Sequence, residues 1–388
     1  MKKMNWKWTL VFAAALVGTA VLLDALAFAG KPAPPPPPPP PPPVNYRITW
    51  LNATNAGNYI GMNDSGDIVG NYVGLNGRRG AFLYTSATGL VAMNSLVDSG
   101  VKFSDAQGIN NLGQIVGQGS INGNEIRYLF TPGLGVEQIP LPPGFDFAFP
   151  WGINDYGDVV VAATKYGTPS GTTEVFVYDR ASTPNNPFWI DTGANPQSDG
   201  NWLAINNHTQ VVGTSSQAFR WTPNGTPNGT LELFGLSTLA YGVNDDGHFV
   251  GGASAKDGYR AYRFDSTGMK KLGTLGHASE AWGINDLGQV VGGYTVTSKT
   301  QGTHLYGFLY TDASGMVNLD NLVIGTTDDL TKWRSAARTE SRKINTPRLL
   351  DGTANRNGFG QICGTAWFKD ATGQLTISDA FLLTPEPK

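Results

Sequence analysis

The chain has 388 residues, of which 27 are basic and 30 acidic, with a formal net charge of −3 and one cysteine. Without residues 1–43 the remainder holds 23 basic and 29 acidic residues, so it offers no electrostatic footprint for nucleic acid or an anionic membrane surface. Because Cys363 is the single cysteine, an intrachain disulfide is excluded. The low share of charged residues, 15%, and the 50 glycines indicate sheets that are buried on both faces and joined by tight turns.

The N-terminal segment has the features of an export signal. Lysines precede the apolar run Thr9–Leu23, whose fifteen residues are fewer than the about 20 that a membrane span needs. The small residues around Ala27–Ala29 predict cleavage before Gly30, with an uncleaved anchor as the alternative. We therefore expect residues 1–29 to be a signal peptide and the protein to be secreted, extracellular or periplasmic, with no membrane attachment after cleavage.

Residues 30–45 are expected to be a proline-rich linker. The unbroken run Pro34–Pro43 favours the extended polyproline helix, at about 3.1 Å per residue. It would hold the body of the protein, residues 46–388, roughly 30 Å from whatever holds the N-terminus.

One short motif recurs seven times in this body, most clearly as "WGINDLGQVVGG" at Trp282–Gly293. Aligned on their asparagines, the copies lie 47, 44, 52, 38, 41 and 72 residues apart. The anchors are Asn63, Asn110, Asn154, Asn206, Asn244, Asn285 and Asn357. Six copies carry a glycine three positions later: Gly66, Gly113, Gly157, Gly247, Gly288 and Gly360. Self-similarity at this period is typical of repeat architectures.

The motif predicts a tight hairpin turn between two buried strands. In the quoted copy, Gly288 would take the left-handed conformation of a type I turn with a G1 bulge, while the Asn285 side chain bonds the turn's own backbone. Adjacent apolar residues such as Val290 and Val291 point to opposite faces of a strand. Each repeat therefore packs against a neighbour on both sides.

Two further strands follow each turn: an aromatic-rich one such as "AFLYT" at Ala81, and a second such as "GMKKLGTL" at Gly268. Four short strands per unit in seven units predict an all-β, seven-bladed β-propeller of antiparallel blades. The last unit ends after "AFLLT" at Ala380, and the orphan strand Tyr46–Asn52 precedes the first motif. We expect this N-terminal strand to complete the seventh blade and close the ring; an open β-solenoid is the alternative.

Residues 46 to 384 resemble the bacterial extracellular HAF repeats, whose unit pairs "GINDxGQVVG" with "HAFLYT" and "GMxDLGTLGG". The stretch Gly268–Gly293 is similar to that consensus, but the histidine before Ala-Phe is replaced, for example by Gly80, Gln217 and Asp379. The resemblance implies a secreted bacterial protein and no assigned chemistry.

Candidate binding residues are aromatic. Trp151, Tyr241 and Trp282 stand three positions before their anchors, where they could pack blade against blade or form stacking platforms at the pore. A long insertion, Val323–Arg356, holds Trp333 and Arg334 beside other basic residues. We predict Trp333 to be an exposed aromatic on the face with variable loops, because function collects on such loops; a solvated helix face is the alternative.

No reaction centre emerges from the sequence. The recurring turn acids, Asp64, Asp155, Asp245 and Asp286, are interpreted as turn architecture, with calcium ligands as the alternative, and no metal or cofactor is expected. We expect convergent carboxylates to be lacking at the pore. The sequence favours a monomeric, non-enzymatic binding or scaffold module for a glycan, a cell-surface component or a protein, bound through its variable loops. The alternative is a polysaccharide lyase or hydrolase with its site at the pore.

Overall fold

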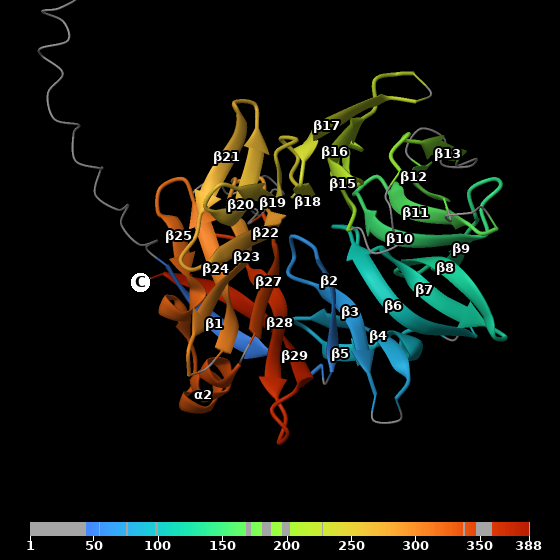
Figure 1. Ribbon diagram of the computed structural model, residues 1–388. Helices are drawn as coiled ribbons and strands as arrows, with labels where there is room; N and C mark the ends of the chain where they lie inside the picture. Colours follow the sequence, from blue (N-terminus) through green and yellow to red (C-terminus); the bar gives the residue numbers. More distant parts are fainter. Residues whose placement is uncertain are drawn as a thin grey trace, which may run out of the picture. The chain divides into compact units, whose positions relative to one another are not determined.

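Seven β-sheet blades follow one another in chain order around a common axis (Figure 1). The computed structural model describes residues 44–53, 55–74, 77–97, 100–167, 172–180, 188–195, 202–226, 228–300, 302–336, 338–346 and 359–387. These residues all belong to one compact unit. The expected signal peptide and nearly all of the proline-rich linker lie outside them.

Blades 1 to 5 are separate four-stranded antiparallel sheets. In sheet order their strands are β2 (Ala56–Met62), β3 (Ile68–Val73), β4 (Arg79–Thr85) and β5 (Gly89–Ala92); β6 (Val101–Ile109), β7 (Ile115–Ile121), β8 (Asn124–Thr131) and β9 (Gly135–Ile139); β10 (Phe147–Ile153), β11 (Val159–Lys165), β12 (Thr172–Asp179) and β13 (Phe188–Asp191); β14 (Ala204–Ile205), β15 (Val211–Thr214), β16 (Gln217–Thr222) and β17 (Thr230–Leu236); and β18 (Thr238–Val243), β19 (Phe249–Ala255), β20 (Gly258–Asp265) and β21 (Gly268–Gly273).

Blades 6 and 7 are linked where Leu305 of β24 lies beside Arg338 of β27. Blade 6 contains β22 (Ala278–Ile284), β23 (Val290–Ser298), β24 (Gly302–Thr311) and β25 (Gly315–Asn318). Blade 7 contains β27 (Arg338–Ile344), β28 (Ile362–Lys369), β29 (Leu375–Pro387) and β1 (Val44–Trp50), with β26 (Val323–Ile324) added outside β1.

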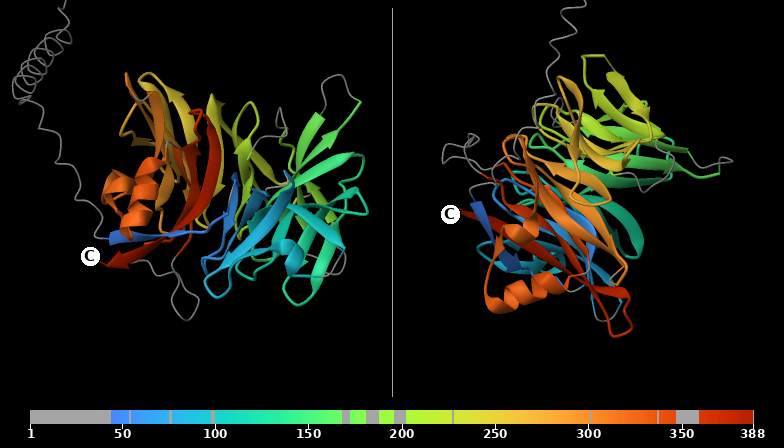
Figure 2. Two further views of the ribbon diagram at one scale, coloured as in Figure 1. Left: turned by 90° about the horizontal axis from the view of Figure 1, so that it is seen from below. Right: turned by 60° about the vertical axis from the view of Figure 1, so that its left-hand side comes forward.

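The N-terminal strand closes the ring, as the sequence predicted. β1 runs antiparallel to β29 from Val44 opposite Pro387 to Trp50 opposite Phe381. Figure 2 shows this blue strand beside the red C-terminal strand. The two ends of the described chain therefore share one blade, which joins blade 6 to blade 1 and makes the propeller a closed ring rather than an open solenoid.

Apolar side chains of the described residues are buried between neighbouring blades in seven clusters. Val290 belongs to the core between blades 5 and 6, whereas the adjacent Val291 belongs to the core between blades 6 and 7. In blade 2, likewise, Ile115 belongs to the core shared with blade 1 and Val116 to the core shared with blade 3. Second strands buried on both faces thus explain the paired apolar residues of the motif, and the buried Cys363 lies in one of these cores.

The antiparallel order gives the ring two different ends. One, the turn face, carries the turns between first and second strands. The other, the loop face, carries the connections between blades and the loops between second and third strands. The short helices η1 (Met93–Ser95) and η2 (Leu319–Asn321) and the helix α2 (Thr327–Ser335) belong to connections between blades. Within the described part of the chain no helix is long and apolar enough to cross a membrane.

Candidate functional site

Each repeat turn is organised by its asparagine side chain. In blade 6 the Asn285 Oδ1 accepts hydrogen bonds from the backbone N–H groups of Leu287 (3.1 Å) and Gln289 (3.0 Å). Gly288 adopts φ 72°, the left-handed conformation that the turn requires. The same conformation occurs at Gly66, Gly113, Gly157 and Gly247. In blade 4, Thr209 takes it at φ 55° where the sequence has no glycine.

The asparagines also join the blades to one another. The Asn285 Nδ2 donates to the carbonyl oxygen of Asn345 in blade 7, at 2.9 Å. The equivalent bonds run from Asn63 to Asn110 (3.2 Å), Asn110 to Asn154 (2.8 Å), Asn154 to Asn206 (3.2 Å), Asn206 to Asn244 (2.8 Å), Asn244 to Asn285 (3.1 Å) and Asn345 to Asn63 (3.4 Å). The chain of amides therefore returns to its first member.

This ring corrects the seventh anchor predicted from the sequence. Asn345 occupies the seventh position, and its Oδ1 accepts from the Gln361 backbone N–H as Asn285 does from Gln289. The predicted anchor Asn357 lies outside the described residues. Gly360 does not have a positive φ, and its position is not the turn glycine. The seventh turn therefore contains an insertion, residues 347–358, and turns on this face are not short in every blade.

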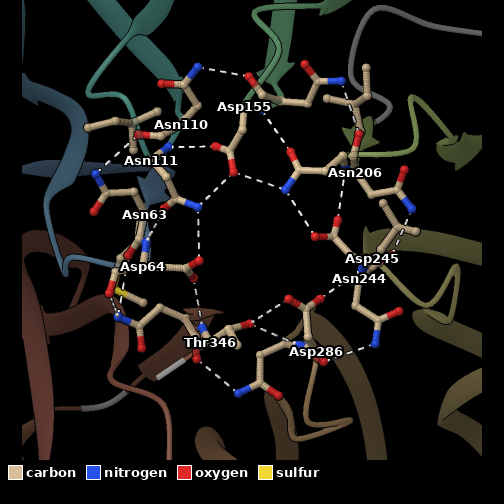
Figure 3. Close-up of a pocket in the computed structure, with 18 of the residues that line it drawn as sticks. Asn63, Asp64, Asn110, Asn111, Asp155, Asn206, Asn244, Asp245, Asp286 and Thr346 are labelled. Atoms are coloured by element: carbon tan, nitrogen blue, oxygen red, sulfur yellow. Dashed lines mark hydrogen bonds between the residues drawn. The ribbon is translucent and has the colours of Figure 1, made fainter. Parts of the chain in front are cut away.

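A second ring lies just inside the first (Figure 3). It is formed by the residue that follows each anchor: Asp64, Asn111, Asp155, Asn207, Asp245, Asp286 and Thr346. Each backbone N–H donates to the side-chain oxygen of the next member, at 2.8 to 3.1 Å. The sequence indicated that these acids belong to turns, but not that their carboxylates meet around the axis.

The two rings enclose a cavity of about 170 Å³ on the turn face. Its mouth is lined by the four Asp carboxylates, and its wall by apolar residues that precede the anchors, such as Ile153 and Ile284. The expectation that the pore lacks convergent carboxylates is therefore wrong. Among the described residues, however, no three His, Cys, Asp or Glu side chains are grouped so that they could hold a metal ion.

Amide side chains separate most of the carboxylates in the inner ring. Asn111 Nδ2 donates to Asp64 (3.0 Å) and Asp155 (2.9 Å), and Asn207 Nδ2 donates to Asp155 and Asp245 (both 3.0 Å). Two acids are direct neighbours only at Asp245 and Asp286. Burial, followed by the negative charges of Asp245 and Asp64, raises the pKa of Asp286 above its usual value.

The aromatic residues predicted near the pore do converge on the axis. Trp151 and Trp282 are buried, and Tyr241 is half-buried. Trp282, Tyr241 and Trp202 line a space of only about 20 Å³ together with Arg342. The Arg342 guanidinium lies 4.4 Å from the ring centre of Trp282 and 4.9 Å from that of Trp202. These side chains fill the channel between the two faces.

Polar contacts fix this channel filling. The Glu280 carboxylate accepts from the Tyr241 hydroxyl (2.9 Å), the Tyr259 hydroxyl (3.0 Å) and the Trp282 Nε1 (3.1 Å). Burial, with the Glu280 charge second, raises the pKa of Tyr241. Arg342 is paired with Glu340, which is fully buried. The geometry favours the packing interpretation of Trp151, Tyr241 and Trp282, and their binding role stays a prediction.

Small residues next to these aromatics let the inner strands approach closely. A Cβ on Gly242 would lie 2.9 Å from the Trp282 carbonyl oxygen, and one on Gly283 would lie 2.8 Å from the Arg342 carbonyl oxygen. Trp202 and Arg342 were not predicted to line the channel. Arg342 does stand three positions before Asn345, so a correct seventh alignment would have revealed it.

Trp333 is not the exposed aromatic that the sequence predicted. It is only 3% exposed, and its ring packs on Phe381 (centroids 5.1 Å apart) and Trp50 (6.4 Å). Its Nε1 donates to Asp320 Oδ1 at 2.7 Å. The helix α2 thus covers the closing strand β1, because Trp333 points from the helix toward blade 7. Arg334 is exposed on the same helix, and its binding role stays a prediction.

The expected basic cluster of the insertion is divided in the structure. Lys332 pairs with Asp379 at 2.6 Å and lies over the Trp50 ring at 4.2 Å. Arg338 and Arg342 both pair with the buried Glu340. These cations stabilise blade 7 and the channel, so they do not form one surface for a ligand.

A different basic surface lies on the loop face, between blades 1 and 2. A cavity of about 830 Å³ is bordered by the ends of β3 and β4 that face each other, by η1, by the start of β6 and by the end of β7. Its lining includes Arg78, Arg79 and Lys102, all exposed, and the aromatic residues Tyr72 and Phe103. We call it the loop-face groove. The sequence does not reveal this groove, because its cations come from two repeats and only the adjacent pair Arg78-Arg79 forms a local signal.

Comparison with known proteins identifies the architecture. No protein-family model matches the chain, and no curated protein matches it in sequence. Among solved structures, the β-propeller domain of the Trilobed protease from Pyrococcus furiosus is similar with a TM-score of 0.51 and 8% identity, over 88% of this chain and 97% of that domain. The chain is a β-propeller.

Two further solved structures are similar at a lower level. A subtype N11 neuraminidase-like protein of H18N11 from a flat-faced bat matches with a TM-score of 0.37 and 11% identity, over 87% of this chain and 89% of that one. TolB from Acinetobacter baumannii has the same TM-score at 13% identity, over 55% of this chain. The chain spans about half of the TolB chain, 53%.

Proposed function

We propose that the protein is an exported, non-enzymatic binding or scaffold module that recognises a glycan, a cell-surface component or a protein through its loop face. The observation that supports this proposal is the loop-face groove. Its volume of about 830 Å³ falls within the roughly 300–1,000 Å³ of typical ligand sites. The axial cavity on the turn face is much smaller, at about 170 Å³.

The bonding of the axial acids also supports a binding role. Each of the four Asp side chains of the inner ring accepts a hydrogen bond from a neighbouring backbone N–H. A carboxylate held in this way links one blade to the next and so has a structural role in the ring. The hydrogen bonds on the turn face are thus best explained as contacts that hold neighbouring blades together.

We further infer that the chain is an exported protein of the HAF repeat type and a monomer. The seven copies of the motif support the repeat type, and the N-terminal apolar run supports export. N-terminal sequencing of protein recovered from outside the cytoplasm should begin at Gly30. A chain that still begins at Met1 would show an uncleaved anchor.

The groove can be tested by filling it. Ser120 lies near the end of β7 and lines the groove. Ser254 is the equivalent residue of β19 in blade 5 and is exposed. Each serine stands two residues before the turn that leads to the third strand of its blade. Ser120→Trp should abolish binding of the full-length protein to a glycan array or to whole cells, whereas Ser254→Trp should leave it unchanged. Equal binding by both variants would rule out the groove as the recognition site.

A second candidate function is a polysaccharide lyase or hydrolase with its site at the pore. The convergence of Asp64, Asp155, Asp245 and Asp286 on the axial cavity is the observation that favours it. Product release from polysaccharide by the wild-type protein, lost in Asp155→Asn with unchanged thermal stability, would establish this alternative. Absence of product across acidic and neutral polysaccharides would favour the binding module.

A further inference from the structure

The loop-face groove has a charge opposite to that of the protein as a whole. The chain has a net charge of −3, yet the described lining of the groove carries Arg78, Arg79 and Lys102 and no acidic residue. The Asp105 carboxylate lies beside this lining, with its Oδ2 3.8 Å from Arg79 Nη1. Among the described residues, the exposed Arg79 and Lys102 lie beside this one carboxylate, so this part of the lining is locally positive.

That carboxylate is largely committed to the protein. The Asp105 side chain is 5% exposed, and its Oδ1 accepts from Asn71 Nδ2 at 2.6 Å. The Arg79 side chain is 60% exposed. At 3.8 Å from its partner, and with most of its surface in water, the guanidinium keeps donors that can bind a second anion.

The floor of the groove is flat and partly apolar. The Tyr72 ring lies against Gly80, where a Cβ would come within 2.8 Å of it, so the ring is held against the strand backbone. Phe103 is buried beneath the groove and packs edge-on against Tyr128, with ring centroids 4.8 Å apart. An aromatic surface rimmed by a few charged groups is the usual construction of a selective binding site.

Resting on the proposed binding function, we propose that this groove binds an anionic polysaccharide. Arg79 and Lys102 pair with the carboxylate or sulfate groups of the polymer, and Tyr72 lies against a sugar ring. The two cations come from both sides of the groove, Arg79 from the start of β4 in blade 1 and Lys102 from β6 in blade 2. That placement suits a ligand that repeats its negative charges along an extended chain. Arginine forks match both carboxylate and sulfate geometry.

The test is a binding titration of the full-length protein with three labelled probes. These are an oligogalacturonate, which carries carboxylates, a heparin-derived oligosaccharide, which carries mainly sulfates, and an uncharged malto-oligosaccharide. One or both anionic probes should bind, with the affinity falling as salt rises. Tighter binding of one anionic probe identifies the charged group that the groove prefers.

Charge-removing variants locate the site. Arg79→Gln and Lys102→Gln should each weaken anionic binding by about 10-fold, the range of one charge-assisted contact. Lys256→Gln, which removes an exposed cation from the β19–β20 turn of blade 5, is the matched control and should bind as the wild type does. All three residues are exposed, so unchanged thermal midpoints should confirm that folding is unaffected.

The outcomes separate this assignment from the general proposal. If the uncharged probe binds as tightly as the anionic ones and only Ser120→Trp abolishes binding, the groove is a binding site but not one for anions. If an acidic peptide or single-stranded DNA binds and neither anionic oligosaccharide does, the ligand class is wrong. Failure of both anionic oligosaccharides to bind also overturns the assignment. Anionic binding that survives Ser120→Trp overturns both proposals.

Discussion

The side-chain amide of Asn285 donates to the backbone carbonyl of Asn345, at 2.9 Å, across 60 residues of sequence. The same side chain uses its Oδ1 to hold its own turn. One residue therefore sets the local hairpin and attaches its blade to the next. Because all seven anchors do this, the turn conformation of any blade is coupled to the closure of the whole ring.

Asn285→Asp tests this double role. Aspartate keeps the oxygen that accepts from the turn, but it replaces the Nδ2 donor with a carboxylate oxygen facing the Asn345 carbonyl. We expect a loss of about 2–4 kcal/mol of unfolding free energy, since a buried acceptor loses its donor and a charge is buried.

The control is Asn124→Asp, which adds the same charge at an exposed position at the start of β8. It should change the unfolding free energy little in the same denaturant titration. If the two variants are equally stable, the bond between blades does not stabilise the ring.

The sequence predicted the parts of the fold that depend on local rules. The glycine and asparagine of each turn have requirements that any copy reveals, and the missing strand after β29 predicted the closing strand β1. The seventh anchor failed for a specific reason. Gln361 and Cys363 align correctly with the motif, but the insertion separates them from Asn345, so a local alignment chose Asn357 instead.

The side chains that fill the central channel could be predicted only in part. Sequence positions indicated that Trp151, Tyr241 and Trp282 would face the centre. They did not indicate whether an open pore remained, because this depends on Trp202 and Arg342 from other blades filling the space. Trp333 was misjudged for a similar reason, since the strand that buries it lies at the other end of the chain.

The closing strand should be essential for stability. Deleting residues 46–52 removes the strand paired with β29 and should lower the thermal midpoint sharply. Within that strand, Tyr46 is fully buried, and Tyr46→Ala should cost about 3–5 kcal/mol. Arg47→Ala is the control, because it removes only the exposed pair with Glu386 and should barely change the midpoint.

Tyr46→Phe refines the same experiment. The Tyr46 hydroxyl is buried and has no hydrogen-bond partner among the described residues. Burial also raises its pKa. Removing the hydroxyl should therefore leave stability unchanged or improve it, since a buried polar group without a partner costs free energy. A large loss of stability in Tyr46→Phe would mean that the hydroxyl forms a stabilising hydrogen bond.

Trp333 should stabilise the fold rather than bind a ligand. Trp333→Ala should lower the unfolding free energy by about 3–5 kcal/mol, because the ring packs on Trp50 and Phe381. Trp333→Phe keeps a ring but removes the donor to Asp320, so it should cost less. Arg334→Ala, at an exposed neighbouring position, is the control. A Trp333→Ala variant with unchanged stability and weakened ligand binding would restore the binding interpretation.

Asp286 should make the protein less stable as the pH rises. Its pKa is raised in the folded state, chiefly by burial and then by the charges of Asp245 and Asp64. The folded chain therefore holds this proton more tightly than the unfolded chain, whose aspartates have a pKa of about 3.9. By linkage, stability falls as the pH rises from that value through the folded pKa, and the cost is present in full above it.

Asp286→Asn should therefore stabilise the protein at neutral pH, by about 0.5–1 kcal/mol, the size of one like-charge contact. Asparagine can still accept from the Asp245 N–H and can donate to the Thr346 hydroxyl, and it extends the alternation of acids and amides around the inner ring. The gain should disappear below about pH 3.9, where the acid is neutral in both states.

The control is Asp246→Asn. Asp246 follows Asp245 in the blade 5 turn and is exposed, so this variant removes the same charge outside the inner ring and should show no such gain. Denaturant titrations of the three proteins across this pH range decide the point: a destabilised Asp286→Asn at neutral pH would mean that the ionised carboxylate, and not merely an acceptor oxygen, holds blades 5, 6 and 7 together.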